Sequence, residues 1–377
     1  MKPMKKATFL LLLIPMSTLL SAKSAEDAIA SLVAVGPKGQ GNEAASKAWP
    51  EVAALGAEKL PALLEAMNKA NGLGQNWLRA AVDAIAQRTL KNGDKLPAKE
   101  LKAILDDVSH QPVTRRLAFE LIAKASPKRA TKLIPGFIDD PAPELRRDAV
   151  AQVLEKAAAE KSADLYDKAL RAARDVDQIE ASAKALKEAG REVDLPKVMG
   201  FLMRWKVIGP FDNTDRKGFA VAYPPEKKID FGASYEGKEG KVKWSDFATS
   251  DAFGMVDVNL EFGELKQVVA YAHTFYESPE AREVQFRLGC KNAWKVWLNG
   301  ELLFARDEYH RGIRIDQYLI DAKLKKGKNA ILVKLCQNEQ EQSWTKQWQF
   351  QLRVTDASGT ALLAANRQPT PQAKPKK

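Results

Sequence analysis

Histidine and cysteine are scarce in this chain. Its 377 residues include three histidines and two cysteines, which are His110, His273, His310, Cys290 and Cys336. The histidines are far apart, and none has a second ligand at the spacing typical of zinc sites. Neither cysteine has a histidine beside it to activate the thiol. The sequence therefore predicts no metal site and no cysteine nucleophile.

Familiar catalytic motifs are also missing. The chain contains no His-Glu-x-x-His, Gly-x-Ser-x-Gly, phosphate-binding Gly-Lys-Ser/Thr or Cys-x-x-Cys. Ser343-x-x-Lys346 matches a β-lactamase-type pair, but it lies between two tryptophans in a β-rich loop and opens no helix. Carboxylates that suit glycoside hydrolysis by type alone are Asp212, Asp215, Asp307 and Glu308. We predict a protein that is not an enzyme and has no cofactor. An enzyme of unrecognised type is the third hypothesis, after the two binding functions given at the end of this subsection.

No apolar run is long enough to cross a bilayer. Phe9–Leu20 has 12 residues, whereas a membrane helix needs about 20. The run follows three lysines and precedes small residues, which is the pattern of a secretory signal peptide. We predict that residues 1–25 are removed, with cleavage after Ala22, Ser24 or Ala25. The mature protein would then be periplasmic or extracellular and lack a transmembrane segment, and an uncleaved N-terminal anchor is the alternative.

Basic residues outnumber acidic ones. The chain has 59 Lys and Arg against 48 Asp and Glu, a formal charge of +11. In a cytosolic protein this excess would first suggest nucleic acid. Predicted export favours anionic envelope polymers, lipid head groups or acidic polysaccharide instead. We therefore expect a polysaccharide or glycan partner and no nucleic acid, and the alternative is a solvated surface that only aids solubility.

Helical patterns fill the chain from Ala28 to Gly190. In residues 56–67, apolar side chains recur at i, i+3, i+4 and i+7, the spacing of an amphipathic helix. Further patterns lie at 77–90, 100–107, 113–125, 130–138, 143–159, 165–174 and 178–189. Ala81-Val82, Ala118-Phe119 and Ala149-Val150 recur at spacings of 37 and 31 residues. Such a period is typical of stacked helical hairpins.

One stretch carries a family resemblance. Residues 133–150, Leu-Ile-Pro-Gly-Phe-Ile-Asp-Asp-Pro-Ala-Pro-Glu-Leu-Arg-Arg-Asp-Ala-Val, resemble a HEAT repeat. In that repeat an Asp-Pro turn closes the first helix, and an arginine early in the second reaches back to the turn. Asp139 or Asp140, Pro141 and Arg146 match these roles. The resemblance spans about residues 50–190 and implies an α-solenoid that binds a protein partner or only spaces the domains.

The arginines of these helices have two interpretations. Arg79, Arg115, Arg116, Arg146 and Arg147 could form a basic ridge, or at least one in each repeat could clamp a turn.

After residue 200 the composition changes to short strands. Predicted strands lie at 205–211, 242–244, 255–260, 267–275, 284–288, 294–298, 302–304, 316–320, 330–335 and 348–354. Asn299-Gly300 predicts a two-residue hairpin turn in which both residues have positive φ. We expect Tyr223-Pro-Pro-Glu226 to be extended, since proline biases its predecessor toward extended backbone. Strands this short and closely spaced are typical of an antiparallel β-sandwich.

Strand phase assigns several side chains to one face or the other. Trp294 should lie in the core and Trp297 on the opposite face. If Ile331, Val333 and Leu335 face the core, Cys336 faces away, whereas Cys290 is in phase with the inward row. This argues against a Cys290–Cys336 disulfide, although export would permit one.

Five segments resemble a known domain: 205–213, 223–226, 295–300, 325–334 and 348–353. They look like a domain of large exported proteins of planctomycete-type bacteria, which is similar to galactose-binding-like jelly rolls such as the sugar-binding domain of β-galactosidase-type enzymes. The resemblance spans about residues 200–356 and implies a jelly-roll sandwich with a carbohydrate-binding or accessory role. Such domains often carry Ser-Asp-Asp or Ser-Asp-Asn where this chain has Cys290-Lys291-Asn292. A hard cation prefers carboxylate oxygens, so we expect no Ca²⁺ at this turn.

Two loops are the candidate ligand site. The segment 306–312 mixes arginine, carboxylate, tyrosine and histidine, groups that bind sugar hydroxyls or acidic groups. The loop 337–347 carries a tryptophan that could stack on a sugar ring. The predicted ligand-binding residues are Arg306, Asp307, Tyr309, His310, Arg311 and Trp344. The alternative is a solvated charged loop with internal ion pairs.

The complete prediction is a multidomain chain, α then β. It has a signal peptide (1–25), a HEAT-like α-solenoid (26–192), a linker (193–204), a galactose-binding-like β-sandwich (205–358) and a disordered basic tail (359–377). The predicted function is exported, non-catalytic binding of carbohydrate or envelope polymer. An envelope scaffold that binds only protein partners is the alternative.

Overall fold

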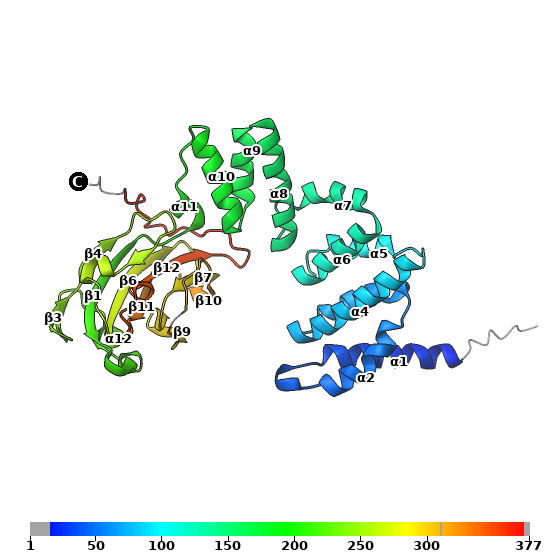
Figure 1. The fold of residues 1–377 in the computed structure, drawn as a ribbon, viewed down its shortest axis with the longest axis horizontal. Coiled ribbons are helices and arrows are strands. Elements are labelled where there is room, and N and C mark those ends of the chain that lie inside the picture. The colour runs from blue at the N-terminus through cyan, green and yellow to red at the C-terminus, as the bar shows by residue number, and fades with distance from the viewer. Residues whose placement is uncertain (1–15, 310, 373–377) are drawn as a thin grey trace, which may run out of the picture. The chain divides into compact units, whose positions relative to one another are not determined.

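A helical half precedes a region of antiparallel sheets (Figure 1). The structure is a computed structural model that describes residues 16–309 and 311–372. The chain forms two compact units, residues 1–156 and 157–377. Most of the predicted signal peptide, residues 1–15, lies outside the described residues, and the first helix, α1 (Met16–Val33), spans the predicted cleavage zone. Within the described part, every helix is too short or too polar to cross a membrane.

The first unit consists of packed helices. After α1 come α2 (Asn42–Ala53), α3 (Leu60–Met67), α4 (Gly72–Lys91), α5 (Ala98–Asp106), α6 (Pro112–Ala125), α7 (Pro127–Leu133) and most of α8 (Pro143–Glu160), with short 3-10 turns between several of them. The predicted apolar row Leu60, Leu63, Leu64 and Met67 is fully buried. Asn71 caps α4, because its side-chain oxygen accepts the amides of Leu73 and Gly74. Each helical pattern predicted between residues 56 and 159 therefore overlaps a helix of this unit.

The turn before α8 is clamped by two arginines. Arg146 Nε donates to the carbonyl oxygen of Asp140 at 2.7 Å, and its Nη2 donates to that of Asp139 at 3.0 Å. Arg115, from the preceding hairpin, makes two 2.7 Å hydrogen bonds to the Asp140 carboxylate. These contacts confirm the predicted clamp by Arg146. They also add a second one that joins successive hairpins.

Exposed charges on α4, α6 and α8 pair with one another. Arg79 pairs with Glu120, and Arg116 pairs with both Glu120 and Asp148. Lys124 on α6 reaches Asp83 on α4 at 2.6 Å. Arg79 and Arg116 therefore join neighbouring helices and do not form an unpaired basic ridge.

Three helices precede the strands in the second unit: α9 (Ala163–Ala172), α10 (Val176–Glu188) and α11 (Leu195–Met199). Helix α11 lies in the segment predicted as a linker, and the Asp194 side chain caps it by accepting the amide of Lys197 at 3.0 Å. Arg353 Nη1 in the last strand donates to the Met199 carbonyl at the end of α11. The unit boundary at residues 156 and 157 thus groups these helices with the strands.

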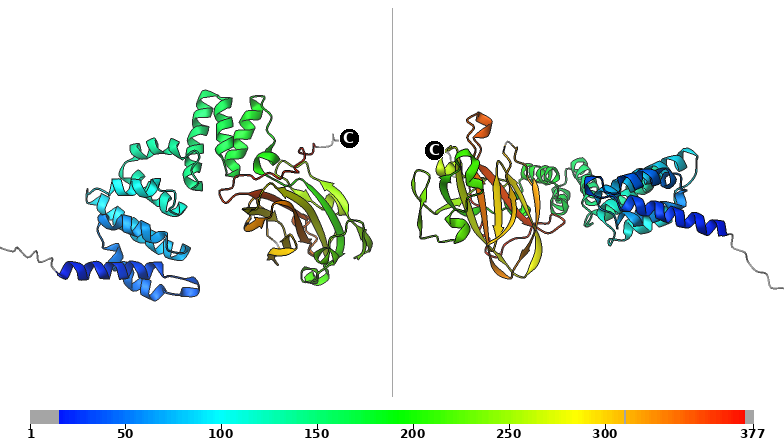
Figure 2. Two further views of the ribbon diagram at one scale, coloured as in Figure 1. Left: turned by 180° about the vertical axis from the view of Figure 1, so that it is seen from behind. Right: turned by 90° about the horizontal axis from the view of Figure 1, so that it is seen from below.

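Two antiparallel sheets form the β region (Figures 1 and 2). The six-stranded sheet has the order β4-β1-β6-β11-β8-β9, and the four-stranded sheet has the order β10-β7-β12-β5. The strands are β1 (Arg204–Asp212), β4 (Ser245–Ala248), β5 (Val256–Asp257), β6 (Val268–Ser278), β7 (Arg282–Cys290), β8 (Trp294–Leu298), β9 (Glu301–Arg306), β10 (Tyr318–Leu324), β11 (Gly327–Cys336) and β12 (Gln349–Thr355). A hairpin of β2 (Ser234–Gly237) and β3 (Gly240–Lys243) is separate.

The two faces of the six-stranded sheet carry different apolar clusters. Trp294 packs in the core between the sheets, whereas Trp297 belongs to the cluster on the outer face, as predicted. Cys290 lies in the first cluster and Cys336 in the second, and both thiols are free. The predicted separation of the cysteines by strand phase is confirmed.

The Asn-Gly hairpin also forms as predicted. Asn299 and Gly300 have φ of 54° and 87°, and Leu298 pairs with Glu301 across the turn.

Two local predictions are wrong. Tyr223 is extended, but the residues after it form one helical turn, α12 (Pro224–Lys227), because proline is tolerated in a first helical turn. The predicted strand 255–260 is only β5, followed by α13 (Asn259–Phe262). Here the Asp257 carboxylate accepts the amide of Asn259 and ends the strand.

Residues 359–372, within the tail expected to be disordered, lie against the sheets. Ala361 forms a bridge with Thr355, the amide of Ala365 donates to Glu277, and Thr370 bonds the Asp194 carboxylate. Residues 373–377 lie outside the described residues.

Candidate functional site

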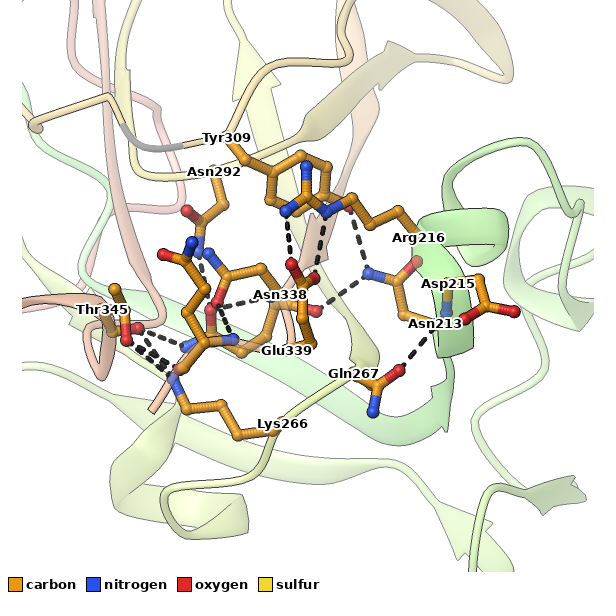
Figure 3. A network of polar contacts seen from close by, with 12 residues as sticks. Asn213, Asp215, Arg216, Lys266, Gln267, Asn292, Tyr309, Asn338, Glu339 and Thr345 are labelled. Atoms are coloured by element: carbon orange, nitrogen blue, oxygen red, sulfur yellow. Dashed lines mark hydrogen bonds and ion pairs between the residues drawn. The ribbon is translucent and has the colours of Figure 1, made fainter. Parts of the chain in front are cut away.

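The loops at one end of the sandwich form a continuous polar network (Figure 3). This end, where β1 and β11 finish and β6 begins, also holds the turn between β7 and β8. The predicted loops 306–312 and 337–347 both contribute to it. The structure therefore brings together the two loops chosen from the sequence.

Trp344 lies on a short 3-10 turn, η5 (Ser343–Thr345). Its exposed fraction is 56%, and it is the only tryptophan among the large apolar residues found exposed in the described part of the chain. The predicted aromatic platform is thus present at the surface.

Side chains from other loops hold the backbone of this turn. Lys291 Nζ donates to the carbonyl oxygen of Trp344, and it reaches the Gln347 side chain at 2.7 Å. Lys266 Nζ donates to the carbonyl of Thr345 at 3.0 Å, and Asn259 Nδ2 to that of Lys346 at 3.0 Å. Each of the three carbonyls from 344 to 346 therefore has a side-chain donor, which fixes the path of the turn that carries the tryptophan.

Gln337 is the buried centre of the network. Its side-chain amide donates to the carbonyls of Thr345 and Lys346 at 3.3 and 3.2 Å, and its oxygen accepts from Asn292 Nδ2 at 2.7 Å. Asn213 Nδ2 donates to the Gln337 carbonyl at 2.9 Å. The first loop after β1 is thereby connected to the tryptophan turn.

The two lysines of the network are partly desolvated. Burial lowers the pKa of the Lys291 ammonium, and burial also lowers the pKa of Lys266 against the raising effect of Glu264 and Glu341. Lys291 Nζ bonds one carbonyl oxygen and one amide oxygen, the type of ligand that a hard cation takes. Lys291, at the turn where the sequence predicted no Ca²⁺, is therefore the residue that anchors Trp344.

Tyr309 packs into the same network. Its hydroxyl accepts a hydrogen bond from Asn213 Nδ2 at 3.1 Å, and the Arg216 guanidinium lies 4.7 Å from its ring centre. Arg216 Nε in turn donates to Glu339 at 3.0 Å (Figure 3). Burial raises the pKa of the Tyr309 phenol, so it remains a neutral hydroxyl. Tyr309 therefore packs within the polar network and contributes to holding these loops together.

The charged residues beside Tyr309 pair within their own loop. Glu308 receives Arg306 Nη2 at 2.6 Å and Arg311 Nε at 2.8 Å. Asp307 is exposed, and His310 lies outside the described residues. Arg306 and Arg311 thus follow the alternative interpretation, a charged loop with internal ion pairs. Trp344 and Asp307, also predicted as ligand residues, are both exposed.

Several amide atoms at this end lack a partner. Asn213 Oδ1, Asn338 Nδ2 and Gln340 Oε1 are buried and have no hydrogen-bond partner in the described part of the chain. Buried polar atoms are normally paired, so each requires water or a bound group. Sequence inspection missed the supporting residues Lys266, Gln337 and Asn213, because nothing in their local pattern distinguishes a network donor from an ordinary loop residue.

No family model matches the sequence, and no curated protein does. Among solved structures, a GH31 alpha-xylosidase from Xanthomonas citri is similar at 11% identity over 30% of this chain and 15% of its own, with a TM-score of 0.19. A beta-glucosidase from Kluyveromyces marxianus is similar at 13% identity over 78% of this chain and 38% of its own, with a TM-score of 0.25. The chain spans well under half of either structure, and likeness at this level carries no argument about function.

Proposed function

We propose that this chain is an exported, non-catalytic binding protein whose sandwich, of the galactose-binding-like jelly-roll type, recognises carbohydrate or envelope polymer. Trp344 is the principal contact, and Asp307 offers a carboxylate to sugar hydroxyls. The helical hairpins, of the HEAT type, serve as a protein-interaction module or as a spacer.

The observation that supports this proposal is the anchored, exposed tryptophan. The Trp344 side chain is 56% exposed, and aromatic faces stack on apolar ring faces. Binding also costs entropy when a loop must be ordered. Because Lys291, Lys266 and Gln337 already hold the turn, stacking on Trp344 requires little further ordering. A fixed aromatic platform of this kind suits the flat face of a sugar ring.

The test is binding of the mature chain, residues 26–377, to a panel of purified polysaccharides by affinity electrophoresis and calorimetry. We expect Trp344→Ala to weaken binding by about tenfold or more, the equivalent of about 1.4 kcal/mol. Leu319→Ala is the matched control, since Leu319 on β10 has the same exposed fraction of 56%. Trp344→Phe should retain part of the affinity.

Two results would redirect the proposal. Failure to bind any polysaccharide, together with a defined protein partner whose binding survives Trp344→Ala, would favour the scaffold alternative. Release of soluble sugars by the wild type that is abolished in Asp307→Ala would indicate an enzyme.

A further inference from the structure

A concave surface lies on the six-stranded sheet, away from Trp344. It has a volume of about 500 Å³, within the range of about 300–1,000 Å³ for ligand sites. We call it the β1–β6 groove, and its principal lining residues are Arg204, Lys206, Phe231, His273, Phe275 and Arg367. We propose that this groove binds an acidic saccharide, one that carries carboxylate or sulfate groups. This inference concerns a site separate from the Trp344 turn and goes beyond the function proposed above.

Strand register places the groove well away from the tryptophan turn. Lys206 pairs with His273 across β1 and β6, whereas Asp212 pairs with Val268 at the loop end. Six residues of β1 separate the two places, a distance of about 20 Å along an extended strand. A short oligosaccharide could therefore bind in the groove without contacting the Trp344 turn.

Aromatic rings form one wall of the groove. The ring centres of Phe231 and Phe275 are 6.2 Å apart, and that of His273 lies 4.6 Å from Phe275. Phe231 and Phe275 are only partly buried, so they present apolar surface at the mouth of the groove. Such surface suits the C–H face of a sugar ring.

The charged residues of the groove are mostly positive. Lys206 pairs with Asp246 at 2.7 Å. The other two basic residues of the groove are Arg204 and Arg367. Arg204 donates to the carbonyl of Pro369 at 3.3 Å, and Arg367 to that of Phe201 at 2.7 Å. In the described part of the chain, neither guanidinium has a carboxylate within 4.0 Å. Guanidinium groups bind carboxylate, sulfate and phosphate through paired N–H donors, so the groove attracts an anionic ligand.

Two buried nitrogens beside the groove have no partner. His273 is 2% exposed, and its Nε2 makes no hydrogen bond within the described residues. Arg367 Nη2 is also buried and makes no hydrogen bond there. Buried polar nitrogens without partners are uncommon. Burial lowers the pKa of His273 to about 4, with a smaller effect from Lys328, so the ring is neutral at neutral pH. An anionic oxygen that entered the groove would give Arg367 Nη2 the acceptor that it lacks among the described residues.

The experiment compares polymers that differ only in charge. The mature chain is titrated with dextran sulfate and with dextran, which share one glucan backbone, and with polygalacturonate and its methyl ester. We expect binding to the two acidic polymers to be at least about tenfold tighter than to their neutral counterparts. Arg204→Gln should reduce that affinity about tenfold, whereas Arg204→Lys should restore part of it.

Arg314→Gln is the matched control. Arg314 is also exposed and precedes β10, so the substitution removes the same charge elsewhere. Equal loss of affinity in Arg204→Gln and Arg314→Gln would overturn the proposal in favour of diffuse charge attraction. Equal binding of dextran and dextran sulfate would also overturn it. The two proposals can fail separately, because binding of the neutral polymers reports on the Trp344 turn, whereas the additional affinity for the acidic polymers, and its loss in Arg204→Gln, reports on the groove.

Discussion

Several arginines of the helical unit pair with carboxylates, whereas the two arginines of the β1–β6 groove do not within the described part of the chain. In the helices, Arg115 is buried against Asp140, and Arg79 and Arg116 join neighbouring helices through acids. In the groove, Arg204 and Arg367 bond only backbone carbonyls. The positive charges of these two regions therefore differ in whether a carboxylate of the chain already neutralises them. In the helical unit these guanidiniums stabilise the fold, whereas in the groove they remain able to bind an external anion.

Arg115→Leu should have the largest effect on stability. The substitution leaves the Asp140 carboxylate buried without its partner, at 8% side-chain exposure. Loss of one member of a buried pair costs about 3–5 kcal/mol of unfolding free energy. Urea unfolding followed by circular dichroism measures this cost. Arg204→Gln is the counterpart and should change stability by less than about 0.5 kcal/mol. Similar losses of unfolding free energy in both variants would contradict the difference between the two regions.

A pH effect of intermediate size is expected from His273. Its folded pKa of about 4 lies below the value of about 6.5 in an unfolded chain. The unfolded state therefore binds the proton first as pH falls from 6.5 to 4, and stability is lost across that window. The loss attributable to this residue is about 3 kcal/mol. Comparing unfolding at pH 7 and pH 4 in wild type and His273→Gln isolates it, because the variant should lose less stability on acidification. Identical pH slopes would contradict the assignment.

The exposed ion pairs of the helical unit should have the smallest effect. Arg79 and Glu120 are 38% and 26% exposed, so solvent screens their attraction. Arg79→Ala should cost no more than about 1 kcal/mol, and 1 M NaCl should reduce the difference from wild type. A salt-independent loss would mean that packing of the arginine stem, and not its charge, joins α4 to α6.

Periodic features were predicted well because they follow from local geometry. The helices, the Asn299-Gly300 turn and the opposite faces of Trp294 and Trp297 depend on spacings that sequence alone displays. The exposed Trp344 was also predicted, since it lies in a polar loop outside any strand phase.

Long-range pairing could not be predicted in the same way. Lys334 has the outward phase of a solvent-facing strand residue, yet it is fully buried and bonds Glu226 at 2.8 Å. That contact depends on the segment that folds over the outer face, about a hundred residues earlier in the chain. The same limit hid the donors of the Trp344 turn, which come from other loops of the chain. These side chains meet only after the loops have been brought to one end of the sandwich.

Lys291 has a consequence for how the tryptophan turn responds to its surroundings. Its ammonium bonds the Trp344 carbonyl and the Gln347 side chain, and it is covalently attached to the chain. A diffusible ion in that position would leave when the medium is depleted of it, whereas a side chain cannot dissociate. The order of this turn therefore does not depend on the capture of a metal ion from the medium.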